Sequence, residues 1–173
     1  TRAAVLAGET QVVIDVVTEP GGAIAAVVEG RLSGLPSFAT EGGLSLDADG
    51  LPVATGTHDA PFRVEIPQGQ GDYPFLMFGH GTGGSFHDGL FDQELAKEGI
   101  GKVGISFYGW TDADVIDTFL AFVRMCEGTH HSTAFLMQAV ADGAAIQAAM
   151  VGPIGDALSE PLLGGAANPA VGR

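Results

Sequence analysis

Residues 73–85 read YPFLMFGHGTGGS, and the rest of the chain is interpreted outward from this stretch. Its apolar run at residues 74–78 is too short for a helix, and glycines fill four of the six positions from 79 to 84. A short apolar run that ends in such a cluster is typical of a buried strand leading into a tight loop. Glycine lets the loop adopt positive φ and lets its backbone approach a bound group. Free N–H groups in such a loop form an anion-binding concavity.

Downstream of this loop, the sequence predicts a helix and a second strand. Residues 85–98 carry apolar side chains at near-helical spacing, and Gly99 stands where a helix C-cap belongs. Residues 102–107 (KVGISF) are the next strand, which completes a βαβ unit with two parallel strands and a right-handed crossover. We therefore predict an α/β fold with residues 73–78 as its central strand and residues 102–107 beside it.

Two further helices are expected to cover the faces of the sheet. The first begins at Thr111 or Asp112, carries an amphipathic stripe and ends at Gly128. The second runs from about residue 129 or 132 to residue 150. Residues 152–173 are rich in Gly, Ala and Pro, and we expect a loop or a disordered end there.

Upstream, residues 11–17 and 23–32 flank a Pro-Gly-Gly turn and predict an antiparallel hairpin. Residues 33–57 are rich in Gly, Ser, Pro and Asp and are expected to be a long surface excursion. Within them, DADG at residues 47–50 resembles the opening of a calcium loop but lacks the remaining ligands, so a plain Asp-Gly turn is predicted. Residues 62–66 (FRVEI) alternate as a strand with one polar face.

Composition limits the class of protein. The 173 residues suffice for one domain with a core, and a hydrophobic share of 46% excludes a disordered chain. The net charge of −14, with scattered basic residues, argues against nucleic acid and anionic membranes as partners. No apolar run approaches the roughly 20 residues of a transmembrane helix. The single Cys126 excludes an internal disulfide and leaves the compartment undecided, with an extracellular or periplasmic location preferred.

Residues 62–150 resemble the N-terminal part of an α/β-hydrolase of the lipase/esterase kind. HGTGG at residues 80–84 is similar to the HGGG-type oxyanion loop that follows the third strand in that family. The resemblance implies an ester or lipid substrate, no cofactor, and a backbone N–H donor from Gly81 or Thr82, with His80 shaping the loop. It also implies a sheet in which the third strand lies between the fourth strand and the fifth, the strand that carries the nucleophile.

The chain departs from the family's pattern in its missing nucleophile. No G-x-S-x-G pentapeptide occurs, GISFYG at residues 104–109 is one residue too long, and the last histidine is His131. We therefore expect residues 1–151 to be the N-terminal part of a hydrolase domain and residues 152–173 to lead to a C-terminal part that holds the triad. Alone, the chain is expected to be inactive and marginally stable.

Three alternatives stay open. In the first, Ser106 is the nucleophile of a complete catalyst, although a serine in an apolar strand is usually just buried. Its base would be His80, His87 or His131, oriented by Asp112 or Asp114. In the second, Cys126, His130 and His131 bind a metal, but adjacent helical histidines point about 100° apart. In the third, the chain is a binding or structural module without chemistry. The apolar set Phe119, Phe122, Phe135 and Met137 is interpreted as core rather than as an acyl pocket.

Overall fold

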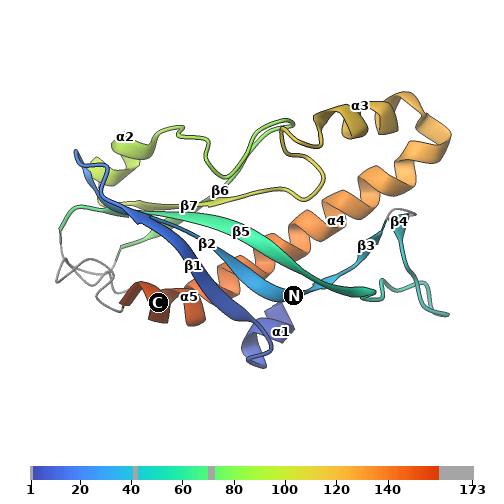
Figure 1. Ribbon diagram of the computed structural model, residues 1–173, viewed down its shortest axis with the longest axis horizontal. Helices are drawn as coiled ribbons and strands as arrows, with labels where there is room; N and C mark the ends of the chain where they lie inside the picture. Colours follow the sequence, from blue (N-terminus) through green and yellow to red (C-terminus); the bar gives the residue numbers. More distant parts are fainter. Residues whose placement is uncertain (1, 41–42, 70–72, 160–173) are drawn as a thin grey trace.

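Five strands form one mixed sheet in the order β1-β2-β5-β7-β6, with helices on both of its faces (Figure 1). The computed structural model describes residues 2–40, 43–69 and 73–159. The strands of the sheet are β1 (Gln11–Thr18), β2 (Ile24–Ser37), β5 (Gly56–Pro67), β6 (Phe75–Gly79) and β7 (Gly101–Ile105). The helices are α1 (Arg2–Leu6), α2 (Asp92–Lys97), α3 (Val115–Val123), α4 (Met125–Met150) and α5 (Pro153–Ser159). A small second sheet pairs β3 (Ala39–Thr40) with β4 (Gly43–Leu44). The α/β class predicted from the sequence is therefore confirmed.

The predicted N-terminal hairpin is present, but its second strand is longer than expected. β1 and β2 pair antiparallel, and β2 continues to Ser37, where it still pairs with Gly56 of β5. The expected surface excursion at residues 33–57 is therefore wrong at both ends. Its loop-like composition reflects a bulge, since the register shifts between Leu32 and Leu35 and Gly34 has a φ of 83°.

The aspartate turn at residues 47–50 has the plain geometry that the sequence predicts. The Asp47 carboxylate accepts the N–H groups of Asp49 and Leu51, each at 2.9 Å. A carboxylate that bonds the backbone two residues ahead is an Asx turn. The turn therefore stabilises its own backbone with this side chain.

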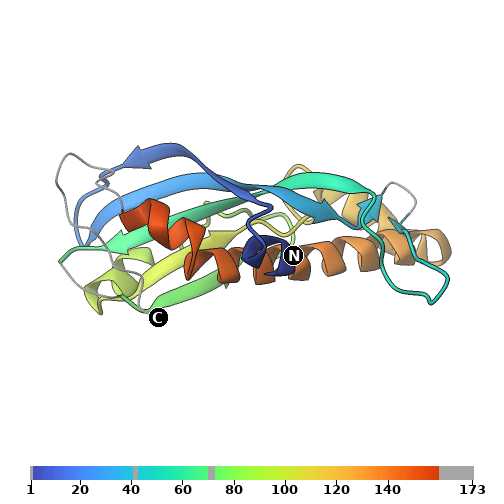
Figure 2. The ribbon, with the colours of Figure 1, turned by 90° about the horizontal axis from the view of Figure 1, so that it is seen from below.

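The main core lies between the sheet and the layer formed by α1, α4 and α5 (Figure 2). Alternate residues of β5, Phe62 and Val64, point into this core and contact residues such as Ile146 of α4, because side chains along a strand alternate between faces. On the opposite face, Ala96 of α2 packs against Ile24 and Val27 of β2. Arg63 and Glu65, which alternate along β5 with its two core-facing residues, therefore lie on the α2 face.

The parallel pairing of β6 with β7 is confirmed, but β6 is not the central strand. Phe75 pairs with Gly101 and Gly79 with Ile105 in parallel register. β7 also pairs antiparallel with β5, so it separates β6 from the rest of the sheet. Within the described residues β6 is an edge strand, and its Leu76 side chain is 44% exposed.

The helix expected at residues 85–98 is confined to α2, Asp92–Lys97. The preceding segment is not helical because its backbone bonds to side chains of β7 and its end: Phe86 N–H donates to Ser106 Oγ, and Lys102 Nζ donates to the Asp88 carbonyl. The predicted C-cap is present. Gly99 has a φ of 69°, and its N–H and that of Ile100 close a Schellman motif on Ala96 and Leu95.

The C-terminal helices differ from the predicted boundaries. α3 begins at Val115 rather than near Thr111 and ends at Val123. Arg124 separates it from α4, which begins at Met125 and continues through Gly128, where the sequence predicted a helix end. One helical glycine costs only about 1 kcal/mol, which is too little to end a helix of this length. Of the expected tail at residues 152–173, Pro153–Ser159 form α5 and the remainder lies outside the described residues. None of the described helices has the length and apolar character needed to cross a membrane.

Candidate functional site

The loops that follow β6 and β7 leave the sheet at the same edge because the two strands are parallel. In open α/β sheets, ligands bind outside the carboxyl ends of the strands. Here that region contains the HGTGG loop after β6 and residues 106–114 after β7. Two backbone contacts join the loops: Gly83 N–H donates to the Trp110 carbonyl at 2.9 Å, and Gly84 forms a bridge with Thr111.

His80 is buried and both of its ring nitrogens are engaged. Nδ1 lies 2.6 Å from the Gly81 carbonyl, and Nε2 lies 2.8 Å from the Phe107 N–H. A carbonyl only accepts and a backbone N–H only donates, so Nδ1 carries the proton and Nε2 is the acceptor. His80 therefore ties the loop after β6 to the end of β7, which favours its structural interpretation over a role as a base.

The peptide between Gly81 and Thr82 has a fixed orientation. The Gly81 carbonyl accepts hydrogen bonds from His80 Nδ1 and, at 3.0 Å, from the Gly84 N–H. The described chain contains no cis peptide bond, so the Thr82 N–H points away from that carbonyl and its two donors. Thr82 is exposed, and within the described residues its N–H has no hydrogen-bond partner. The loop thus presents a preoriented backbone donor to its surroundings.

Two glycines of this region are required by close approaches. A Cβ atom on Gly79 would lie 2.2 Å from the Phe107 ring, and one on Gly84 would lie 2.8 Å from the His80 Cβ. Both distances are too short for real side chains, so the tight packing of His80 and Phe107 depends on glycine at both positions. The sequence predicted a tight glycine loop here, and the close approaches are to the chain's own Phe107 and His80 side chains, whereas an approach to a bound group stays a prediction.

Ser106 is not assembled with a base in the described part of the chain. Its Oγ accepts the Phe86 N–H at 3.2 Å, and no histidine there is hydrogen-bonded to it. His87 Nε2 lies 3.5 Å from a Glu29 oxygen, and the His131 ring contacts Phe135. Asp114 accepts the Thr111 N–H and hydroxyl, and Asp112 accepts the Ala113 N–H. The serine, histidines and aspartates of the first alternative therefore contact different partners and do not form a triad in the described part of the chain.

The metal alternative receives no support from the described residues, among which no group of three or more His, Cys, Asp or Glu side chains is placed to hold an ion. His130 is exposed on α4. The Cys126 side chain lies outside the described part. The metal alternative at Cys126, His130 and His131 therefore stays untested.

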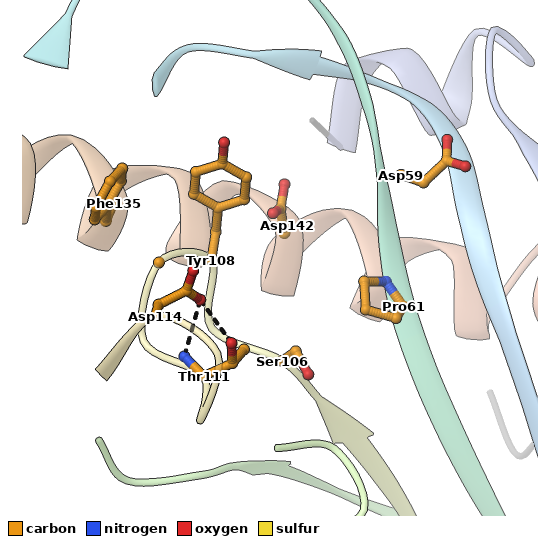
Figure 3. A pocket seen from close by; sticks show the side chains of 9 residues that line it. Asp59, Pro61, Ser106, Tyr108, Thr111, Asp114, Phe135 and Asp142 are labelled. Carbon is orange, nitrogen blue, oxygen red and sulfur yellow. Dashed lines mark hydrogen bonds between the residues drawn. The ribbon is translucent and has the colours of Figure 1, made fainter. Parts of the chain in front are cut away.

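A cavity of about 270 Å³ lies beside the loop after β7 (Figure 3). It is lined by Ser106, Tyr108 and Thr111 from this loop, by Phe135 and Asp142 of α4, and by Asp59 and Pro61 of β5, among others. Of the apolar set predicted from the sequence, Phe135 lines this cavity, whereas Phe119 and Met137 are 65% and 42% exposed. Phe122 lies outside the described side chains. The three described members of the set therefore form neither a common pocket nor a buried core.

Sequence reasoning missed a polar cluster next to this cavity. His58 Nε2 lies 3.0 Å from both carboxylate oxygens of Asp142, and Gln138 Nε2 donates to Asp142 at 2.8 Å. Gln138 also accepts the Phe38 N–H, so it ties α4 to the end of β2. The available signal was the spacing of Gln138 and Asp142, two polar residues one helical turn apart in a mostly apolar helix. Its partner His58 lies 84 residues from Asp142 and carried no such signal.

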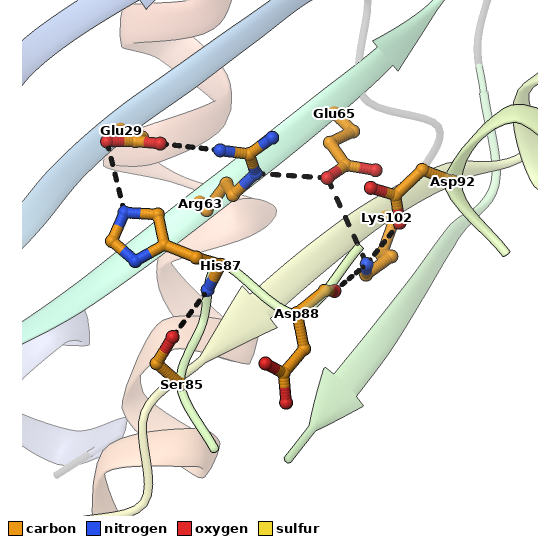
Figure 4. Close-up of polar contacts among 8 residues, drawn as sticks. All are labelled: Glu29, Arg63, Glu65, Ser85, His87, Asp88, Asp92 and Lys102. Atoms are coloured by element: carbon orange, nitrogen blue, oxygen red, sulfur yellow. Dashed lines mark hydrogen bonds and ion pairs between the residues drawn. The ribbon is translucent and has the colours of Figure 1, made fainter. Parts of the chain in front are cut away.

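A network of charged side chains lies on the α2 face of the sheet (Figure 4). Arg63 joins Glu29 at 2.6 Å and Glu65 at 3.0 Å, while the buried Lys102 forms an ion pair with Asp92. Burial raises the pKa of the Glu65 carboxyl above its ordinary value of 4.5, and the neighbouring Asp92 adds to this shift, whereas Arg63 and Lys102 oppose it. The pKa of Glu65 is therefore higher in the folded protein than in the unfolded chain.

We expect the Glu65→Gln variant to gain stability relative to the wild type as the pH rises. The raised pKa of Glu65 means that its contribution is fully present below 4.5 and is lost as the pH rises through the folded-state pKa. Glutamine stays neutral and shows no such loss. Urea unfolding of both proteins at about pH 4 and about pH 7 measures the difference. Glu94→Gln, an exposed change on α2, is the control, and a wild-type advantage that grows with pH would contradict the prediction.

Comparison of the chain with models of protein families, with curated proteins and with solved structures found no match. The functional assignment therefore depends on the geometry of the loop after β6.

Proposed function

We propose that this chain is the N-terminal part of a serine hydrolase that acts on carboxylic esters or lipids. Its share of the active site is one donor of the oxyanion hole. The observation that carries the proposal is the Gly81–Thr82 peptide, whose carbonyl is bonded inward by His80 and Gly84 while the Thr82 N–H is exposed without a partner in the described chain. A preorganised N–H with no other bond to make is the donor that a developing oxyanion requires.

The order of the strands also supports the proposal. The α/β-hydrolase resemblance implies that the third strand lies between the fourth and the fifth. In the sheet, β7 comes later in the chain than β6 yet lies between β6 and β5, and β6 has a free edge within the described residues. This is the arrangement expected if β6 corresponds to the third strand and β7 to the fourth, with the fifth strand supplied from elsewhere.

In the complete enzyme, a serine activated by histidine would attack the acyl carbonyl and expel the alcohol, and water would then release the acyl group from the serine. During both steps the carbonyl oxygen carries negative charge. The Thr82 N–H, with Gly81 as the neighbouring candidate, would stabilise that charge together with the N–H of the residue after the nucleophile. The serine, the acid and the histidine of the triad are assigned to a part of the protein outside this chain.

We expect residues 1–173 alone to be inactive on a short-chain p-nitrophenyl ester and the full-length protein to turn it over. The physical reason is that an oxyanion donor without a nucleophile cannot form the acyl-enzyme. Steady-state assays of both proteins check this. In the sequence that encodes the protein, a G-x-S-x-G within about 30 residues of Arg173 would mark the nucleophile.

Two other results would point elsewhere. Turnover by residues 1–173 that is lost in the Ser106→Ala variant would assign catalysis to Ser106. No turnover by either protein on esters of several acyl lengths would favour a non-catalytic binding or structural module, which the missing triad also fits.

A further inference from the structure

Three residues on one face of β7 and its extension contact the segment that follows the HGTGG loop. Side chains two residues apart along a strand lie on the same face, so Lys102, Gly104 and Ser106 form one row. Lys102 Nζ donates to the Asp88 carbonyl at 2.6 Å, and Ser106 Oγ accepts the Phe86 N–H at 3.2 Å.

Gly104, the middle residue of the row, lets the segment approach the strand. A Cβ atom at Gly104 would lie 2.6 Å from the Phe86 carbonyl oxygen. That neighbour is backbone and cannot rotate away, so any side chain at Gly104 would push residue 86 off the strand. Each residue of the row therefore fits one backbone group of the segment: Ser106 accepts the Phe86 N–H, Gly104 leaves room for the Phe86 carbonyl, and Lys102 donates to the Asp88 carbonyl.

We propose that Lys102, Gly104 and Ser106 are positioning residues that clamp residues 86–92 and thereby hold the Thr82 N–H in its outward orientation. This inference rests on the proposed function for its catalytic consequence, but not for its structural content. The loop is held by the hydrogen bonds of His80 at its start and by the bond from Gly83 to Trp110, one residue after Thr82. The clamp holds the chain again from residue 86 onward, which limits the movement of the glycine loop between His80 and Phe86.

The burial of Lys102 supports a specific role for its charge. Its side chain is only 2% exposed, and a buried ammonium is costly to desolvate unless its partners compensate. Besides the Asp88 carbonyl, its Nζ contacts Asp92 and lies 3.9 Å from a Glu65 oxygen (Figure 4). It also lies 4.8 Å from the centre of the Phe78 ring. The closest partners, the Asp88 carbonyl and the Asp92 carboxylate, both belong to the clamped segment.

The clamp assigns Ser106 a role different from that of a nucleophile. Its Oγ is an acceptor for the Phe86 N–H, and its removal would loosen the loop without removing a reacting atom. A loosened donor weakens stabilisation of the transition state and leaves ground-state binding nearly unchanged. The expected signature is a lower kcat with a constant KM.

The test uses Ser106→Ala and Lys102→Met in the full-length protein, with Ser33→Ala in β2 and the exposed Lys97→Met as matched controls. Hydrogen exchange at the Phe86 and Gly84 amides is measured first, because it needs no catalytic activity. Both amides are hydrogen-bonded, Phe86 to Ser106 Oγ and Gly84 to the Gly81 carbonyl that orients the Thr82 N–H. We expect exchange about tenfold faster in both clamp variants and unchanged exchange in the controls. Unchanged exchange at both amides in the clamp variants would overturn the proposal.

Ester turnover is measured on the same proteins. We expect kcat to fall about tenfold in each clamp variant, KM to stay within about twofold, and Lys102→Arg to recover most of the loss. If Lys102→Met does not fold, Ser106→Ala carries the test alone. Complete loss in Ser106→Ala together with labelling of Ser106 by a fluorophosphonate would overturn the proposal. Faster exchange in a full-length protein without any esterase activity would support the clamp and contradict the proposed function.

Discussion

Replacing Thr82 by proline is expected to lower the kcat of the full-length protein by about 10²–10³-fold, whereas Thr82→Ala should change it little. Proline has no backbone N–H, so it removes the proposed oxyanion donor. Alanine keeps the N–H and removes only an exposed side chain. KM should stay nearly constant in both variants, because the donor acts on charge that develops in the transition state. Steady-state kinetics on a short-chain p-nitrophenyl ester gives both constants.

The control for the proline substitution is Ala48→Pro. Ala48 is the second residue of the turn at residues 47–50, which is closed by the bond from Gly50 N–H to the Asp47 carbonyl at 3.1 Å. Proline is well tolerated at this position of a turn, so the variant should keep full activity and equal or greater stability. Equal losses in Thr82→Ala and Thr82→Pro would argue against the backbone donor.

The Met77 amide is expected to exchange about 10²-fold faster or more than the Leu76 and Phe78 amides in residues 1–173. The Gly101 N–H donates to the Pro74 carbonyl, and peptide groups alternate in direction along a strand, so the N–H groups of Leu76 and Phe78 face β7. The Met77 N–H faces the edge of β6 that has no partner within the described residues. Hydrogen exchange with residue-level resolution measures the three amides in one sample.

The same measurement on the full-length protein tests the proposed fifth strand. If another strand pairs with β6, the Met77 amide becomes as slow as its neighbours, since its N–H then joins a ladder. An exposed apolar strand edge also promotes aggregation, so residues 1–173 are expected to be less soluble than the full-length protein. Protection of Met77 for hours in a monodisperse monomer of residues 1–173 would show that no further strand is needed.

Local chemistry determined several features that the sequence alone could predict. The apolar run before the glycines predicted β6, and its pairing with β7 follows from the βαβ pattern. Gly99 marked the end of α2 because only a residue that tolerates positive φ closes that cap. The HGTGG motif predicted a tight loop after β6, and Gly84 fits this prediction because a Cβ atom there would lie 2.8 Å from the Cβ atom of His80, four residues earlier.

Only the tertiary structure decided how distant residues share these contacts. β6 lies at the edge because β7, and not β6, pairs with β5. Strand pairing uses backbone N–H and C=O groups, which nearly every residue carries, so the sequence does not show which strand becomes the neighbour of β5. The bond of His80 to Phe107 spans 27 residues, and that of Ser106 to Phe86 spans 20, so neither leaves a periodic trace in the chain. Residues 85–91 have helical spacing yet form turns over β7, because Lys102 bonds the Asp88 carbonyl that a helix would have used and Ser106 holds the Phe86 N–H. A pattern in sequence records which face a residue prefers, whereas the partner on that face is set by where the rest of the chain folds.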